Sequence, residues 1–230
     1  MRSEKVTSFV DFIKQSDFFD VLCHSVVFRG QPVQGNLLPS IARKDPSVDT
    51  TDTEKKVLEQ LKLQGASMLA ANGDTDLDLL VTAQHYGLKT RLLDWTTNPL
   101  IALWFACADY KDGDVFVYGL EADSLLGENV YEKSPFTPSK TRIIQPRLNN
   151  ARVIAQQGWF TLHRYAKKNS RFVPLEHNAE TKRYLHEFIV PASKRAAMLA
   201  ALDRHGISSK TIFPDLSGLC SHLNWKHELS

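Results

Sequence analysis

The chain has 230 residues, of which 43% are hydrophobic and 23% are charged, with a net charge of +2. This is ordinary globular composition with enough apolar residues for a sizeable core, which excludes fibrous and disordered classes. The sequence has three widely spaced cysteines, no apolar signal segment and no run approaching the ~20 apolar residues that span a bilayer, so it predicts a soluble, cytoplasmic protein without disulfides or a zinc site.

Charge is distributed unevenly along the chain. Residues 133–175 contain nine Lys and Arg residues and no Asp or Glu, whereas residues 1–132 are acidic overall. One interpretation is a surface that faces a polyanion such as nucleic acid, with Arg142, Arg147, Lys167 and Lys168 holding phosphates. The other is a solvated basic face that offsets the acidic first half.

The first 50 residues predict a helix, a strand and an irregular segment. Apolar spacing over residues 5–20 is helical. Residues 25–31, SVVFRGQ, predict a strand with Val27 and Arg29 on one side and Val26 and Phe28 on the other. An arginine at the end of a buried strand needs a partner. Either an external anion or the carboxylate of Asp94 is expected to pair with the Arg29 guanidinium. A segment with two prolines follows, with a single turn at 40–42.

Three helices are predicted next. The first covers residues 52–71 and ends at Asn72-Gly73, and the second is capped by Asp74 and ends at Tyr86-Gly87. The third begins at Asn98-Pro99, because Asn favours the cap and Pro the first turn of a helix.

The second half of the chain is richer in strands. Strands are predicted at 114–120, 156–165 and 182–191, with a long excursion over 121–150. A helix over 192–206, a short strand near 211–213 and a final helix capped by Asp215 complete the chain. Without alternation of strands and helices, this order predicts one α+β domain, residues 1–230, with a mixed or antiparallel sheet and helices packed from the N-terminal half.

Residues 84–106, QHYGLKTRLLDWTTNPLIALWFA, concentrate hydrogen-bonding side chains beyond the needs of a core. Structural roles compete with functional ones here. Arg91 and Asp94 could form an ion pair that fixes the loop, Trp95 could anchor the core, and His85 could cap a helix.

Several segments together resemble the bacterial FRG domain family. They are FRGQ at 28–31, LLPSIAR at 37–43, residues 84–106, ARVIAQQGWFTLH at 151–163 and FPDLSGL at 213–219. A looser resemblance is to the arginine-serine-glutamate class of the ADP-ribosyltransferase fold. Arg29 matches its strand arginine, Trp95-Thr96-Thr97 its hydroxyl strand, and Glu187 the glutamate that opens a later strand. Threonine replaces the serine, and Leu185 stands where the class has Glu or Gln.

These resemblances imply NAD as substrate, no metal, and a cleft lined by three catalytic residues, Arg29, Thr96 and Glu187. Arginine suits the pyrophosphate, and a carboxylate stabilises the oxocarbenium ion formed when the nicotinamide bond breaks. Gly30 would let the ligand approach the backbone. The NAD-binding set is expected to be Arg29, Gly30, Gln31, His85, Tyr86, Thr90, Arg91, Asp94, Trp95, Thr97 and Gln157.

The implied function is an intracellular mono-ADP-ribosyltransferase that acts as a bacterial toxin or anti-phage effector. Nucleic acid, particularly RNA, is the favoured acceptor because of the basic segment, and an antitoxin protein is a possible partner. The alternatives are an NAD glycohydrolase, and a module that binds a nucleotide or nucleic acid without chemistry.

Overall fold

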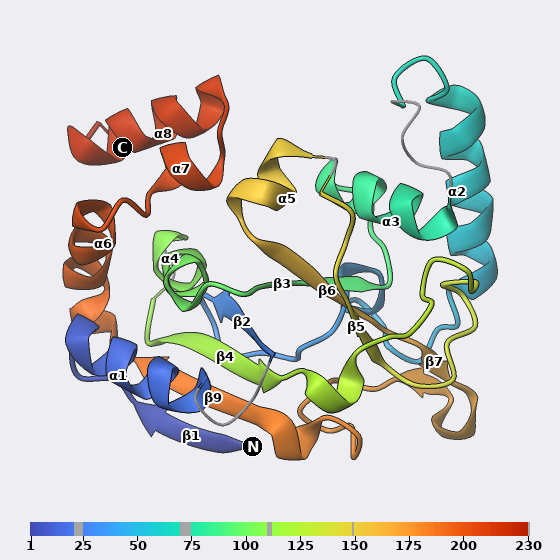
Figure 1. Ribbon diagram of the computed structural model, residues 1–230, viewed down its shortest axis with the longest axis horizontal. Coiled ribbons are helices and arrows are strands. Elements are labelled where there is room, and N and C mark those ends of the chain that lie inside the picture. The colour runs from blue at the N-terminus through green and yellow to red at the C-terminus, as the bar shows by residue number, and fades with distance from the viewer. Residues whose placement is uncertain (21–24, 70–74, 110–111, 149, 230) are drawn as a thin grey trace.

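A computed structural model of the chain describes residues 1–20, 25–69, 75–109, 112–148 and 150–229 (Figure 1). The predicted helix end at Asn72-Gly73 and the predicted cap Asp74 lie outside the described residues.

The described strands form a seven-stranded sheet in the order β1-β9-β4-β2-β3-β6-β5 and a separate two-stranded ribbon (Figure 1). In the large sheet β1 pairs parallel to β9, and the other pairs are antiparallel. The predicted α+β class with a mostly antiparallel sheet is therefore confirmed. The strands are β1 (Arg2–Lys5), β2 (Val26–Gln31), β3 (Leu92–Thr96), β4 (Val115–Glu121), β5 (Arg142–Ile144), β6 (Gly158–Leu162) and β9 (Leu185–Val190), with β7 (Tyr165–Ala166) and β8 (Arg171–Phe172) in the ribbon.

Helices cover one face of the large sheet. The apolar side chains of α1, α4 and α6 pack on β2, β4 and β9 in one core, and α2 and α3 pack near β3, β5 and β6 in another. The α-helices are α1 (Phe9–Asp20), α2 (Thr51–Gln64), α3 (Asp76–His85), α4 (Pro99–Ala108), α5 (Ala151–Ala155), α6 (Arg195–Arg204), α7 (Ser209–Ile212) and α8 (Leu216–Lys226). Short 3₁₀ turns include η1 (Ser40–Ala42), at the predicted position, and η3 (Lys167–Asn169).

Connecting segments rather than helices cover the opposite face of the central strands. Leu37, Leu125 and Leu175 pack there against Val27 of β2 and Leu120 of β4. This face also carries the side chain of Arg29, because side chains alternate along a strand and Val27 and Arg29 share a side. The face that holds the predicted arginine is therefore bounded by loops, which is where binding sites commonly form.

The helix caps follow the sequence closely. The side chain of Asn98 accepts from Leu100 N at 2.9 Å, with Pro99 as the first residue of α4. The side chain of Asp215 accepts from Gly218 N at 2.8 Å and begins α8. Both caps depend only on neighbouring residues, so the sequence predicts them well.

Some elements differ from the expectations. The first helix begins at Phe9 rather than at residue 5, because residues 2–5 form β1. The predicted strand near 211–213 is wrong, since Ser208 and Thr211 form a capping box that starts α7. Among the described residues, no helix is both long and apolar enough to cross a membrane.

Candidate functional site

Arg29, Tyr118 and Glu187 form a row across three neighbouring strands. Arg29 of β2 pairs with Tyr118 of β4, and Tyr118 pairs with Glu187 of β9. Directly paired residues in an antiparallel sheet project to the same face, so the three side chains stand side by side. Arg29 and Glu187 are two strand spacings apart, about 10 Å between their backbones.

Arg29 reaches from β2 towards β3. Its Nε donates to Oε1 of Gln31 at 3.1 Å, and its Nη1 donates to the main-chain oxygen of Asp94 at 2.8 Å. The Asp94 carboxylate lies 3.7 Å from the same nitrogen. Burial lowers the pKa of Arg29 to about 10, which leaves the guanidinium charged at neutral pH. Of the two partners expected for Arg29, this structure shows the internal one, Asp94.

Glu187 is a buried carboxylate with neutral donors around it. Its side chain accepts from Ser3 Oγ at 2.7 Å and from Gln34 Nε2 at 2.9 Å, and Glu187 itself is 3% exposed. The Tyr118 hydroxyl also hydrogen-bonds to it, and burial followed by the Glu187 charge raises the pKa of Tyr118. His186 projects to the other face, as the alternation of a strand requires, and its ring meets the Phe19 ring edge to face.

A cavity of about 420 Å³ opens where β2 and β3 separate. These strands pair only at Phe28 and Thr96, so the chain parts beyond that point. Two arginines, Arg29 and Arg152, line the cavity together with Asp94. The other lining residues include Gly30, His85, Trp95, Thr96, Phe105, Gln156 and Phe213. Six residues predicted for the site, Arg29, Gly30, His85, Asp94, Trp95 and Thr96, therefore share one cavity.

The walls of this cavity are aromatic and charged. Phe105 and Phe213 meet edge to face with centroids 6.1 Å apart, and the Arg152 guanidinium lies 4.8 Å from the Phe213 centroid. Arg152 also bonds to Asp215 at 3.1 Å. Burial, and then the Arg152 charge, lower the pKa of His85. Cationic, aromatic and carboxylate groups in one cavity suit a ligand with phosphate, ring and hydroxyl groups.

The prediction that Arg29, Thr96 and Glu187 line one cleft is wrong. Because Thr96 pairs with Phe28, its side chain lies on the face opposite to Arg29 and Glu187. Its hydroxyl accepts from Asn98 N at 3.1 Å, a contact that shapes the turn before α4. Glu187 is not among the residues that line the cavity.

Arg91 serves the core rather than a ligand. Its side chain is fully buried, and its Nε bonds to Glu54 Oε2 at 2.7 Å. Its Nη1 donates to the Phe136 main-chain oxygen at 3.1 Å, and the guanidinium stacks on the Phe136 ring. The expected ion pair between Arg91 and Asp94 is therefore wrong, and so is the expectation that Arg91 binds NAD.

Other predicted ligand residues also have internal roles. Thr90 is fully buried and donates to the side chain of Gln84. The indole nitrogen of Trp95 donates to Thr161 Oγ1 at 3.0 Å, which makes Trp95 a core anchor at the cavity edge. A Cβ on Gly30 would lie 1.8 Å from the main-chain oxygen of Ala102, so this glycine admits helix α4 rather than a ligand.

Three predicted residues lie at the surface. Tyr86 is 80% exposed, with its ring against His85. Thr97 and Gln157 are exposed and bond to each other through side chains at 3.2 Å and through their backbones. They hold β3 against the turn before β6, and they do not line the cavity.

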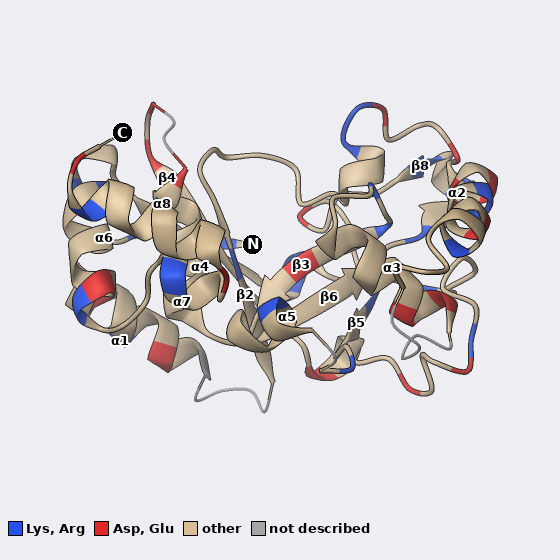
Figure 2. Ribbon diagram, turned by 90° about the horizontal axis from the view of Figure 1, so that it is seen from above, with Lys and Arg blue, Asp and Glu red and all other residues tan. Residues whose placement is uncertain are grey.

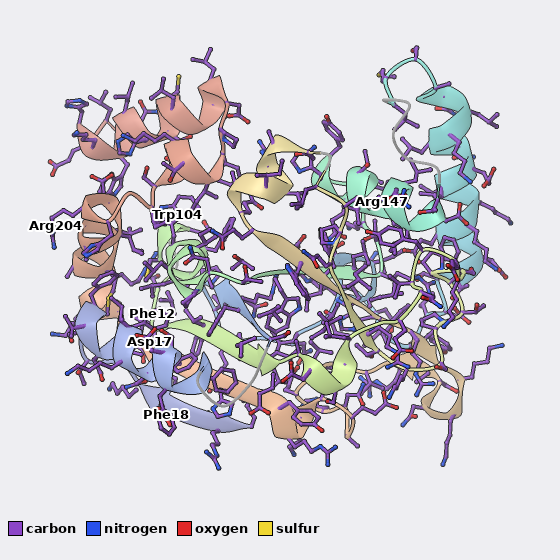
Figure 3. The ribbon with its side chains drawn as sticks, viewed as in Figure 1. Phe12, Asp17, Phe18, Trp104, Arg147 and Arg204 are labelled. Carbon is purple, nitrogen blue, oxygen red and sulfur yellow. The ribbon has the colours of Figure 1, made fainter. Side chains whose placement is uncertain are left out.

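Arg147 in the basic segment 133–175 is committed to a structural contact. Its Nη1 lies 3.0 Å from Oδ2 of buried Asp78 on α3, and its guanidinium covers the Tyr131 ring. Figure 3 shows Arg147 beside α3. Its side chain is also 51% exposed, so the expectation that it holds an acceptor phosphate stays a prediction.

The basic residues of segment 133–175 differ in their surroundings. Figure 2 shows basic and acidic residues interspersed over the molecule in that view. Arg164 lies 3.6 Å from Glu180, whereas Lys167 and Lys168 are exposed in η3. Within the described residues, no cluster of three or more His, Cys, Asp or Glu side chains could hold a metal ion.

The sequence did not predict several residues of the site: Ser3, Gln34 and Tyr118 around Glu187, and Arg152, Phe105, Gln156 and Phe213 in the cavity. The strand over 114–120 was predicted, and with it the place of Tyr118 on one face of that strand. The register of this strand with β2 and β9 could not be predicted. Ser3 carried no signal, because β1 is exposed along its whole length.

Residues 24–115 match the family model described as the FRG domain. The match covers Arg29, Gly30 and the segment from Gln84 to Ala106, and it supports the FRG family. No curated protein matches the chain, and no solved structure matches it either.

Proposed function

We propose that this chain is an NAD-dependent mono-ADP-ribosyltransferase that uses the row of Arg29, Tyr118 and Glu187. The proposal is carried by one observation, the direct pairing of these residues across β2, β4 and β9. An anion-binding group and a buried carboxylate then share one face, two strand spacings apart. A ligand with a pyrophosphate at one end of the row would present its ribose towards the other end.

The chemistry asks for few groups. The bond between nicotinamide and C1′ of the ribose breaks, its electron pair leaves with the nicotinamide, and C1′ gains oxocarbenium character. A nucleophilic atom of the acceptor bonds to C1′ and loses its proton to solvent. Glu187 would stabilise the positive charge at C1′, and Arg29 would hold the pyrophosphate through charge-assisted hydrogen bonds.

The surroundings of Glu187 suit that role. A carboxylate that a cation already neutralised would offer less to a developing positive charge. The donors observed on Glu187 are neutral: a serine, a tyrosine and a glutamine side chain. In a poorly solvated position, such a charge interacts strongly with a cation that forms beside it.

The adjoining cavity would receive the adenosine half of NAD. It opens at the gap between β2 and β3 on the face that α4 covers, opposite to Glu187, so a ligand that reaches both would pass Arg29 at this gap. Its wall includes the aromatic rings of Phe105 and Phe213. Asp94 could accept from ribose hydroxyls, since its side chain is 59% exposed. Arg152 would add a second positive charge near the phosphates.

A second candidate is a nucleotide-binding module without chemistry. The observation that favours it is that Glu187 is shielded and already accepts three hydrogen bonds, while the cavity at Arg29 is open. An NAD glycohydrolase is the same chemistry with water as the acceptor.

The test is incubation of the chain with NAD labelled in the adenylate part, with and without cell lysate. We expect the label in a macromolecular fraction, and the RNA, DNA or protein that carries it identifies the acceptor. Glu187→Gln should abolish transfer while keeping NAD binding, because the amide keeps the shape and loses the charge. Glu121→Gln is the control, since Glu121 lies on β4 near His186, on the opposite face.

Each outcome separates the candidates. Free labelled ADP-ribose without macromolecular label indicates a glycohydrolase. NAD binding with no product indicates a binding module, and no binding refutes all three. We further propose that the transferase acts as an intracellular toxin, so that expression of the wild type should stop growth and expression of Glu187→Gln should not.

A further inference from the structure

Glu187 receives hydrogen bonds from two very different parts of the chain. Ser3 Oγ donates to Oε2 at 2.7 Å, and Gln34 Nε2 donates to Oε1 at 2.9 Å. The two oxygens of one carboxylate are thus held by separate arms, one from the N-terminal strand and one from the segment that follows β2.

The Ser3 arm belongs to the sheet. Ser3 is paired with Glu187 in the parallel register of β1 and β9, and Val6 N continues the ladder to Ile189 O at 2.8 Å. Backbone hydrogen bonds on both sides of Ser3 therefore fix the distance between its hydroxyl and the carboxylate.

The Gln34 arm is held much more lightly. Residues 33–36 are exposed and have no regular structure. The backbone of Gly35 bonds to the Tyr118 hydroxyl, and a Cβ on Gly35 would meet nothing within 4 Å. Segment 32–36 thus lies across Tyr118 and Glu187 through polar contacts, with open space around Gly35.

We infer that Ser3 positions the Glu187 carboxylate and that Gln34 occupies the place of a substrate hydroxyl, so that segment 32–36 must leave before substrate can lie on the row. The inference rests on the proposed function. An amide N–H on a carboxylate oxygen makes the same contact that a ribose hydroxyl makes in glycosyl transfer. Segment 32–36 therefore competes with substrate for the Glu187 carboxylate. Ser3 is a positioning residue that holds this carboxylate in place.

Removing the Gln34 donor and removing the Ser3 donor should have different effects, although both bond to the same carboxylate: the first should change the affinity for NAD and the second should change kcat. Gln34→Ala should lower the Kd and KM for NAD by about tenfold, the effect of one hydrogen bond to a charged group, and should change kcat less than it changes Kd. Ser3→Ala should lower kcat with little change in Kd, and Ser3→Thr should restore it because the hydroxyl returns. Val33→Ala, in the same exposed segment, is the control and should behave as the wild type.

Calorimetric NAD binding, steady-state rates and the melting temperature of each variant test the inference. Gln34→Ala that binds NAD as the wild type does, or more weakly, overturns the role of Gln34. Ser3→Ala with unchanged kcat, or an equal loss in Ser3→Thr, overturns the role of Ser3. A wild-type chain that binds no NAD refutes the proposed function itself, and this inference with it.

Discussion

Arg29 Nη1 donates a 2.8 Å hydrogen bond to the main-chain oxygen of Asp94, across the place where β2 and β3 separate. The side chain thus links two strands at the point where they diverge. It also keeps its positive charge at the mouth of the cavity, within 3.7 Å of the exposed Asp94 carboxylate, which accepts from Gln84 Nε2 at 2.8 Å. A phosphate could displace the Asp94 side chain without breaking the bond to its backbone.

This relationship predicts that removing the charge of Arg29 and removing the charge of Asp94 affect the affinity for NAD in different ways. Arg29→Gln should weaken NAD binding by about tenfold or more, because the variant removes a charge-assisted hydrogen bond to the phosphates. Asp94→Asn should bind NAD at least as well as the wild type, since it removes a competing anion and keeps both the main-chain oxygen and a side-chain oxygen that can accept from a ribose hydroxyl. Calorimetric titration of both variants checks this. Equal affinities for NAD in Arg29→Gln and the wild type would remove the arginine from the site.

The buried pair of Arg91 and Glu54 predicts a large stability effect without a direct effect on binding. Glu54→Ala leaves a fully buried guanidinium without its carboxylate, which should cost about 3–5 kcal/mol of unfolding free energy. Glu59→Ala on the same helix breaks only an exposed pair with Lys62 and should cost about 0–1 kcal/mol. Urea denaturation of the two variants compares them directly. Similar losses in both would mean that the Arg91 pair is not a structural anchor.

The buried histidine His163 predicts a loss of stability in acid. Burial, followed by the charges of Arg29 and Arg91, lowers its pKa to about 3 in the folded chain. The unfolded chain takes up this proton near pH 6.5, so between pH 6.5 and 3 the unfolded state binds more protons and stability falls as pH falls. At pH 5 the loss should be about 2 kcal/mol relative to a pH well above 6.5.

His163→Gln tests this linkage through the slope rather than the absolute stability. The variant should show a shallower decline of unfolding free energy between pH 7 and pH 5 in urea titrations. His177→Gln, at a loop position, serves as the control. A decline as steep in His163→Gln as in the wild type would assign the acid sensitivity to other groups.

The exposed lysines of η3 test the nucleic-acid acceptor. The double variant Lys167→Ala, Lys168→Ala should raise the apparent KM for a nucleic-acid acceptor and flatten its salt dependence by about one unit of log–log slope for each phosphate that the variant no longer binds. Slow NAD hydrolysis should persist, because the row is untouched. Transfer and hydrolysis are measured side by side over a salt series. An unchanged KM for the acceptor would leave the basic segment as a solvated surface.

Features that depend on neighbouring residues were predictable from the sequence. The alternation around Phe28 and Arg29, the Asn98-Pro99 start of α4 and the Asp215 cap all follow from chemistry within a few positions. Features that depend on register were not. Whether Thr96 faces Arg29 or Phe28 is decided by a one-residue choice of strand pairing, which no local pattern encodes.

Contacts between residues that are distant in sequence could not be predicted from the sequence either. The sequence offers Asp94, three positions away, as the ion-pair partner of Arg91. The observed partner is the carboxylate of Glu54, which lies 37 positions earlier on another element. Gly30 was assigned to a ligand because glycine permits close approach of any kind, and the sequence does not say that the approaching group is helix α4.

The boundary of the family match has a consequence for how such domains are delimited. Residues 24–115 end at the first residue of β4, so they contain β2 and β3, which meet at a single pair, and exclude the strand that pairs with β2 along its whole length. A fragment cut at these limits would carry the arginine and the motif but no sheet to hold them, with exposed strand edges prone to aggregation. The matched stretch thus holds the motif, whereas the strands that pair with β2 and β3 along their length, β4 and β6, lie in the remainder of the chain.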